Sequence, residues 1–332
     1  MKLGLIFAVL MTLLVSGLTH AQGDTSTFEA QDGSFSMEIP DDWEIVFEGD
    51  ASALFRVPIA NPGNVAPEGI VAQVESLGVL ISLEVHEDET AESMVVSQLD
   101  EFGAGDDSGE VIQFTVNDMP AASVDEGPAF LGMRWLAVDL GEGQFISVMM
   151  TGTLEQFWLA TPLVLDVLNT FRLEGDDSPV GELVVIEELA ETYTRPEDDL
   201  TFNYPAHWTL QEQTSYTLLI TPTGTTIGIS GEEPGLPIGE ELIELVIDDV
   251  TQQIESNTVI VIEGEPLAFE INELPGLRMI GTDAASDVSY TYVVFQLNED
   301  MLGIISATGY SGDVRILQGT LMAMAESMSV QK

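Results

Sequence analysis

The sequence predicts an α+β protein made of two similar domains in tandem. Three observations support this class. Sequence blocks from the first half recur in the second, apolar residues alternate along the strand that opens each half, and amphipathic helices stand in the middle and at the end of each half. The repeat is as long as a whole domain, so it indicates a duplicated domain and not a solenoid of short units.

Two repeated blocks define the duplication. Phe35-Ser-Met-Glu-Ile-Pro40-Asp-Asp-Trp43 recurs as Leu200-Thr-Phe-Asn-Tyr-Pro205-Ala-His-Trp208. Phe114-Thr-Val-Asn-Asp-Met-Pro120 recurs as Phe269-Glu-Ile-Asn-Glu-Leu-Pro275. The copies are offset by 165 residues at the first block and by 155 at the second, so ten extra residues lie between the blocks of the first copy. We expect them in the loop-like stretch 61–69.

The same order of elements is expected in both copies. After the opening strand, apolar residues at helical spacing predict helices over 91–102 and 240–256, the first capped by Thr90. The later strands are expected at 110–116, 130–140 and 145–151, and at 259–271, 289–297 and 301–308. Closing helices are expected over 157–168, with Pro162 in the early turns, and over 313–326, with Ser311 as a possible cap.

The N-terminus has the layout of a secretory signal peptide. Lys2 precedes an apolar run over 3–18, and small residues lead to Ala21. We expect cleavage near Ala21 and an extracytoplasmic protein, either secreted or periplasmic; an uncleaved anchor is the alternative. The expected boundaries are residues 1–21 for the signal peptide, 24–173 for the first domain, 174–181 for the linker and 182–331 for the second domain.

The charge is strongly acidic. The chain holds 57 Asp and Glu against 8 Lys and Arg, a net charge of −49, while 45% of its residues are hydrophobic. This composition predicts a folded acidic protein, not a disordered one. Nucleic acids and anionic membrane surfaces are disfavoured as partners, because both require basic clusters. The acidity either suits salty surroundings and solubility or provides a surface for cations or a basic partner.

The sequence contains no catalytic or cofactor motif that we recognise. It has no cysteine, which excludes disulfides, thiol catalysis and cysteine metal sites. Weak candidates for a calcium site are the acidic residues of two loops: Asp106, Asp107, Glu110, Glu197, Asp198 and Asp199. A solvated acidic loop is the simpler interpretation of both.

Four tryptophans separate into two kinds. Trp43 and Trp208 occupy equivalent positions, which favours a shared role in the core. Trp135 and Trp158 have no clear counterparts and are therefore weak candidates for an interface. Burial in a strand and in a helix is the alternative for each.

The aromatic-x-Pro-x-x-Trp end of the opening strand, the central amphipathic helix and the closing helix resemble the PsbP/Mog1-like (DcrB-like) domains. The resemblance covers nearly all of both halves in the order of elements. It implies that each domain is an antiparallel sheet flanked by helices on both faces, an α/β/α sandwich. It also implies a domain that works by binding.

These inferences favour an exported, highly acidic, non-catalytic binding or scaffolding protein of the cell envelope or extracellular medium. Its partner is an unknown protein or small ligand, and its oligomeric state is open. We expect no catalytic residue and no cofactor. One alternative is a calcium-responsive module, with Ca²⁺ as the ligand. The other is a hydrolase that uses a pair of carboxylates, which sequence alone cannot select from so many acidic residues.

Overall fold

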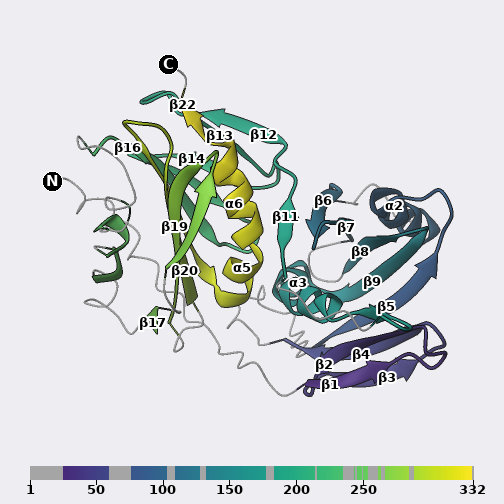
Figure 1. Ribbon diagram of the computed structural model, residues 1–332. Coiled ribbons are helices and arrows are strands. Elements are labelled where there is room, and N and C mark those ends of the chain that lie inside the picture. The colour runs from purple at the N-terminus through teal and green to yellow at the C-terminus, as the bar shows by residue number, and fades with distance from the viewer. Residues whose placement is uncertain are drawn as a thin grey trace, which may run out of the picture. The chain divides into compact units, whose positions relative to one another are not determined.

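The computed structural model describes residues 25–59, 76–102, 109–127, 132–176, 183–213, 215–234, 243, 245–248, 250–252, 261–262, 266–283 and 288–330. The chain divides after Glu188 into two compact units, here called the N-terminal and C-terminal units. Both are built mainly from antiparallel sheets (Figure 1). The expected signal peptide, the loop 61–69 and most of the expected linker lie outside the described residues.

The N-terminal unit has an eight-stranded antiparallel sheet and a three-stranded one. The larger sheet has the order β11-β6-β7-β8-β9-β5-β4-β3. Its strands are β3 (Glu44–Glu48), β4 (Ser52–Pro58), β5 (Ser76–Val85), β6 (Ile112–Val116), β7 (Met119–Glu126), β8 (Gly132–Gly141), β9 (Gln144–Gly152) and β11 (Val185–Glu187). The smaller sheet joins β1 (Thr25–Glu29), β2 (Phe35–Pro40) and β10 (Arg172–Leu173), and the helices are α2 (Ala91–Phe102) and α3 (Leu154–Asn169).

The C-terminal unit repeats this plan. Its larger sheet has the order β14-β15-β16-β21-β20-β19-β17, with β18 also paired to β19. The strands are β14 (Thr209–Glu212), β15 (Thr217–Ile220), β16 (Thr226–Glu232), β17 (Val261–Ile262), β18 (Leu267–Ile271), β19 (Leu274–Asp283), β20 (Val288–Gln296) and β21 (Leu302–Tyr310). The smaller sheet joins β12 (Glu191–Thr194), β13 (Leu200–Tyr204) and β22 (Ser329–Val330), and the helices are α5 (Ser311–Ile316) and α6 (Gln318–Ser327).

Equivalent hydrogen bonds tie the closing helix of each unit to its opening strand. The Glu38 backbone N–H donates to Thr170 Oγ1 at 2.8 Å. In the second unit the Asn203 N–H donates to Ser327 Oγ at 2.9 Å. Glu38 and Asn203 correspond at the offset of 165, and Thr170 and Ser327 both stand at the C-terminal end of the closing helix, so the two units repeat this contact.

Alternate residues of a strand enter different cores, because successive side chains point to opposite faces of a sheet. On β20, Val293 and Phe295 pack in the cluster that includes α6, and Tyr292 and Val294 pack in the cluster of Ile243 and its neighbours. Figure 1 shows α5 and α6 along one face of this sheet. The described residues of the expected 240–256 helix are helical and supply the other face.

The mid-domain helix of the first unit is confirmed at its expected bounds, 91–102. Its expected cap is also confirmed, because the Ser93 N–H donates to Thr90 Oγ1 at 3.1 Å. The Ser93 hydroxyl in turn accepts the Thr90 N–H at 2.8 Å. This reciprocal pair satisfies two donors at the helix start.

The expected placement of Pro162 was wrong. α3 begins at Leu154, so Pro162 lies inside the helix and not in its early turns. The helix starts early because Thr153 and Gln156 form a reciprocal capping box. Proline has no backbone N–H, so Pro162 cannot donate the usual helical hydrogen bond to the preceding turn.

The second closing helix also differs from its prediction. It is two helices, α5 and α6, which meet at Leu317. The residue before α5 is Tyr310, and no side chain caps that end, so Ser311 is not the cap. Ser311 Oγ instead accepts a hydrogen bond from Ser289 Oγ at 2.9 Å.

A strand occurs where the linker was expected to lead directly into the second domain. β11 pairs with β6 in antiparallel register, with Ile186 opposite Thr115. The chain therefore completes the first sheet before the C-terminal unit begins at Leu189.

Candidate functional site

A groove of about 470 Å³ lies in the N-terminal unit beside β11. It is lined by residues 90–92 at the start of α2, 113–115 on β6, 120–121 on β7 and 186–188 on and after β11. Apolar atoms make up most of the lining. Its volume is within the range of small-molecule sites.

The wall formed by β11 is held by backbone hydrogen bonds to β6. The Glu188 N–H donates to the Gln113 carbonyl at 3.1 Å, and the Asn117 N–H donates to the Val184 carbonyl at 2.8 Å. The Asn117 side chain also accepts the Val184 N–H at 2.9 Å. Sequence reasoning missed this wall; its only local signal is the apolar run 183–186 after the polar linker.

The lining combines small buried side chains with acidic ones. Ala91 and Ala121 are buried, so small side chains leave the space open. Glu92, Glu187 and Glu188 supply carboxylates, and none of the described lining residues is a lysine or an arginine. The groove therefore favours an apolar group that carries positive charge over one that carries negative charge.

The carboxylate of Glu92 is held by another residue of the lining, Gln113. Gln113 Nε2 donates to Glu92 Oε2 at 3.1 Å, which links β6 to the first turn of α2. This bond holds one oxygen of Glu92 and leaves acceptor capacity on the carboxylate.

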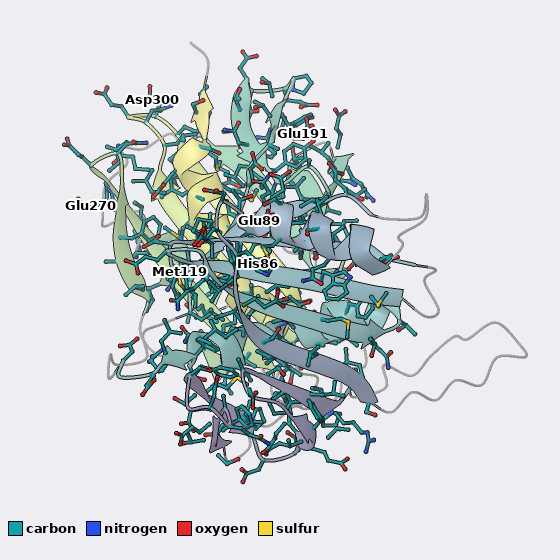
Figure 2. The ribbon with its side chains drawn as sticks, turned by 90° about the vertical axis from the view of Figure 1, so that its right-hand side faces the viewer. His86, Glu89, Met119, Glu191, Glu270 and Asp300 are labelled. Carbon is teal, nitrogen blue, oxygen red and sulfur yellow. The ribbon has the colours of Figure 1, made fainter. Side chains whose placement is uncertain are left out.

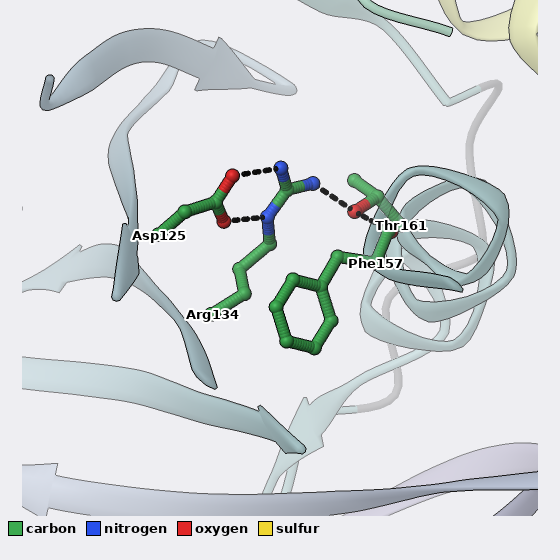
Figure 3. Close-up of polar contacts among 4 residues, drawn as sticks. All are labelled: Asp125, Arg134, Phe157 and Thr161. Atoms are coloured by element: carbon green, nitrogen blue, oxygen red, sulfur yellow. Dashed lines mark hydrogen bonds and ion pairs between the residues drawn. The ribbon is translucent and has the colours of Figure 1, made fainter. Parts of the chain in front are cut away.

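A second polar feature of the same unit is a buried arginine on β8 (Figure 3). Arg134 is 1% exposed and donates to both Asp125 carboxylate oxygens, at 2.6 and 2.8 Å. It also donates to Thr161 Oγ1 on α3 at 2.7 Å, and its guanidinium carbon lies 5.8 Å from the Phe157 ring centre. These contacts link β7, β8 and α3, so we interpret the network as a structural one that holds the helix on the sheet.

The structure describes the side chain of one of the two tryptophans considered for an interface. Trp135 is 4% exposed and packs in the core against α2, so it presents little surface. The side chain of Trp158 lies outside the described part of α3. Trp43 and Trp208 are both buried, as their equivalence indicated.

The acidic loops are not brought together as a metal site in the described part. Asp106 and Asp107 lie outside the described residues, and Glu110, Glu197 and Asp199 are not gathered with other ligands. Among the described residues, no group of three or more His, Asp and Glu side chains has metal-binding geometry.

Asp198 is instead engaged by an arginine. Arg195 is buried and donates to both carboxylate oxygens of Asp198, with the Nε contact at 2.7 Å. Burial opposes ionisation of Asp198, but the hydrogen bonds and charge of Arg195 outweigh it and lower the pKa of the carboxyl below its ordinary value. The ion pair with Arg195 gives this carboxylate a structural role in the turn that precedes β13.

The two histidines of the described chain have local contacts. His86 Nε2 lies 3.0 Å from Glu84 Oε2 on the exposed end of β5. The His207 ring meets the Trp208 ring edge-on, with 6.5 Å between centres. Neither residue lines the groove.

Comparison with known proteins found matches among solved structures. No family model and no curated protein sequence matches the chain. The Ran-binding protein Mog1p of Saccharomyces cerevisiae matches 46% of this chain and 96% of its own length, at 10% identity and a TM-score of 0.33. Cyanobacterial PsbP from Synechocystis sp. PCC 6803 matches 47% of this chain and 98% of its own length, at 12% identity and a TM-score of 0.34.

The chain resembles PsbP/Mog1-like domains. Each of these matches spans about half the chain and nearly all of the PsbP/Mog1-like protein. The immunity protein TplEi of Pseudomonas aeruginosa matches 92% of this chain and 97% of its own, at 9% identity and a TM-score of 0.25. In the described residues, no helix has the length and apolar character needed to cross a membrane.

Proposed function

We propose that this chain is an exported, non-catalytic binding protein whose N-terminal unit holds a ligand with an apolar body and a cationic group. The observation that carries the proposal is the groove beside β11, which combines an apolar lining with the carboxylates of Glu92, Glu187 and Glu188. An apolar site with a few placed polar groups is the usual form of a small-ligand site.

Electrostatics supports a cationic ligand. The lining includes three carboxylates and no basic residue, and the whole chain carries a net charge of −49. A field of one sign attracts ligands of the opposite charge and raises their rate of association. An anionic ligand would meet repulsion at the rim and across the surrounding surface.

Binding is favoured over catalysis by the composition of the groove. Among the described lining residues there is no histidine, lysine or serine, so neither a Ser–His pair nor a lysine nucleophile occurs there. The alternative function, a hydrolase that uses two carboxylates, differs in a measurable way, because it would convert its ligand and not only bind it.

The proposal includes the architecture and location inferred from the sequence. We propose that each unit is an α/β/α sandwich of the PsbP/Mog1-like type, supported in the C-terminal unit by clusters on both faces of β20. We propose an extracytoplasmic location after cleavage near Ala21, supported by the composition of the N-terminus.

Fluorine-detected NMR of the full chain with matched fluorinated fragments tests the binding function. The probes are benzylamines, which are cationic at neutral pH, their neutral N-acetyl amides and the corresponding phenylacetates. The proposal predicts that the amines bind, that the amides bind more weakly and that the carboxylates do not bind. The same spectra show whether a fragment is chemically converted.

Charge variants locate the site. Glu92→Gln combined with Glu188→Gln should weaken amine binding by up to about 30-fold, since each close charge contributes about 1 kcal/mol even in high dielectric. Glu29→Gln with Glu48→Gln removes the same charge from exposed positions elsewhere and is the matched control. Equal binding of amines and carboxylates, equal loss in both variants, or turnover of a fragment would overturn the proposal.

A further inference from the structure

The two units contain equivalent hairpins that differ in what covers their outer strand. β6 and β7 are joined by Asn117 and Asp118, with φ of 50° and 65°. β18 and β19 are joined by Asn272 and Glu273, with φ of 51° and 68°. Both are therefore two-residue turns with positive φ at both central positions, and the hairpins correspond residue for residue.

In the N-terminal unit, the outer edge of β6 is covered. β11 lies along it with Ile186 opposite Thr115. Backbone hydrogen bonds on either side of that pair join Glu188 to Gln113 and Asn117 to Val184. The backbone groups that β6 turns outward are thus those of alternate residues, at positions 113, 115 and 117.

In the C-terminal unit, the equivalent positions are Ala268, Glu270 and Asn272. Ile271 and Leu274 close the hairpin, so β18 turns the N–H and C=O groups of Leu267, Phe269 and Ile271 toward β19 and those of the alternate residues outward.

The outer side of β18 has no strand beside it in the described chain. β17 does not cover this side, because it pairs with Gly281 and Thr282, beyond the part of β19 that β18 occupies. An uncovered strand edge is a template for pairing with another chain.

We infer that this edge of β18, the residues Ala268 to Asn272, binds an extended segment of another protein as an added antiparallel strand. The geometry of β11 on β6 shows how such a strand sits on this hairpin. The inference concerns a surface of the C-terminal unit and goes beyond the ligand groove of the N-terminal unit.

The side chains at the edge indicate the chemistry of that segment. Leu267 is 55% exposed and shares a face of β18 with Phe269 and the buried Ile271. In the first unit, buried Val185 of β11 lies opposite Val116 on the corresponding face. The segment should therefore present apolar side chains at alternate positions on this face.

Its other face should be basic. Glu270 is exposed at the centre of the edge (Figure 2). The stretch 263–273 contains four glutamates and no lysine or arginine. β11 tolerates its own glutamates because it is covalently attached, whereas a separate chain has no such gain in effective concentration and needs complementary charge.

A second copy of this chain fits the edge poorly. Antiparallel self-pairing centred on Glu270 would place two glutamates directly opposite, and like charges in that position are destabilising. Each copy also carries a net charge of −49. A basic segment of a different protein meets neither cost.

The test uses a defined peptide and the full chain. The probe is Leu-Lys-Val-Lys-Val-Lys with a dye at one end, in the register of residues 183–188. Its leucine and valines take the face of Phe269, and its lysines take the face of Glu270. Fluorescence anisotropy at low ionic strength should show saturable binding of this peptide. The matched acidic peptide, with glutamate in place of each lysine, should bind at least about tenfold more weakly, because opposite charges are lost and like charges introduced.

Two changes test strand pairing, and the second of them separates it from general attraction to an acidic surface because it leaves every charge in place. Glu270→Pro removes the outward N–H at the centre of the edge. Methylation of the peptide nitrogen at the second lysine, the residue that should face Glu270, removes the matching donor without altering the protein. Each should weaken binding by about tenfold or more, as expected for a lost backbone hydrogen bond and an added steric block.

Absence of binding, or equal binding of the methylated and unmethylated peptides, would overturn the inference. A dimer detected by sedimentation and abolished by Glu270→Pro would assign the edge to a second copy and also overturn it. The peptide-methylation comparison decides the matter even if Glu270→Pro fails to fold. Fragment binding at the groove is measured separately, so failure at one surface is distinguishable from failure at the other.

Discussion

Removing the carboxylate of Asp125 should destabilise the N-terminal unit strongly. Arg134 is 1% exposed, and Asp125→Ala removes the carboxylate that pairs with its buried guanidinium, while the hydrogen bond to Thr161 stays. Loss of one partner from a buried ion pair costs about 3–5 kcal/mol. The Asp125 side chain is 24% exposed, so water partly replaces it and the lower end, about 3 kcal/mol, is expected.

The size of the unit converts this energy into a measurable shift. For a domain of this length, 1 kcal/mol changes the midpoint of thermal unfolding by about 2–4 °C. Calorimetry of the full chain should therefore show one transition lowered by about 6–12 °C. Glu44→Ala is the matched control, because it removes the carboxylate from the exposed Arg56 pair. That change should cost about 0–1 kcal/mol.

The second unit suggests a compensating exchange. At the positions of Asp125, Arg134 and Thr161 it has Ile280, Thr291 and Gln318, and Gln318 Nε2 donates to Thr291 Oγ1 at 2.7 Å. Transplanting all three residues into the first unit should recover at least half of the stability lost in Asp125→Ala, because no buried charge is left unpaired. Equal, small effects of Asp125→Ala and Glu44→Ala would refute the reasoning.

Three further outcomes are expected. Arg195 lowers the pKa of Asp198, so the stabilisation by this carboxylate is complete above the unfolded pKa of about 3.9 and is lost as pH falls through the lower folded pKa. The native chain should therefore be more stable than Asp198→Asn by about 1–3 kcal/mol at pH 7. Unfolding titrations at acidic pH should show that this difference vanishes. Thr115→Pro should lower the denaturation midpoint more than Glu270→Pro, because only the first interrupts a formed ladder; equal losses would argue against this difference. Gly276→Ala should cost about 1–3 kcal/mol in denaturant unfolding, because its Cβ would lie 2.4 Å from the Phe269 ring, and an unchanged midpoint would count against that packing.

Features governed by local chemistry were predictable from the sequence. The helix over 91–102 follows from apolar spacing and a threonine cap, and its bounds are confirmed. The paired Asn-acid turns follow from residues that tolerate positive φ, and both turns adopt it. The internal repeat predicted two similar domains, because the same order of strands and helices could be assigned to both copies.

Features that depend on distant partners were not predictable in the same way. β11 is an apolar stretch whose role depends on β6, about seventy residues earlier in the chain. The start of α3 was missed because the capping box of Thr153 and Gln156 follows directly after a strand and gives no apolar periodicity. Arg134 gave a signal that was overlooked, since it is one of only 8 basic residues and lies in an apolar strand.

Both proposed binding surfaces arise at the same place in the repeated fold. In the first unit, a strand from the linker covers the edge of the hairpin and builds one wall of the groove. In the second, no described strand covers that edge. The central claim is that the presence or absence of a strand on this edge determines where each unit is proposed to bind.

Amide hydrogen exchange of the free full chain, resolved to single residues by NMR, tests this claim most directly. Exchange reports whether a backbone N–H is engaged in a stable ladder. The Thr115 amide, which faces β11, should be protected, and the Glu270 amide at the equivalent position should exchange rapidly. Equal and strong protection of the two amides would show that the second edge is covered and would contradict the claim.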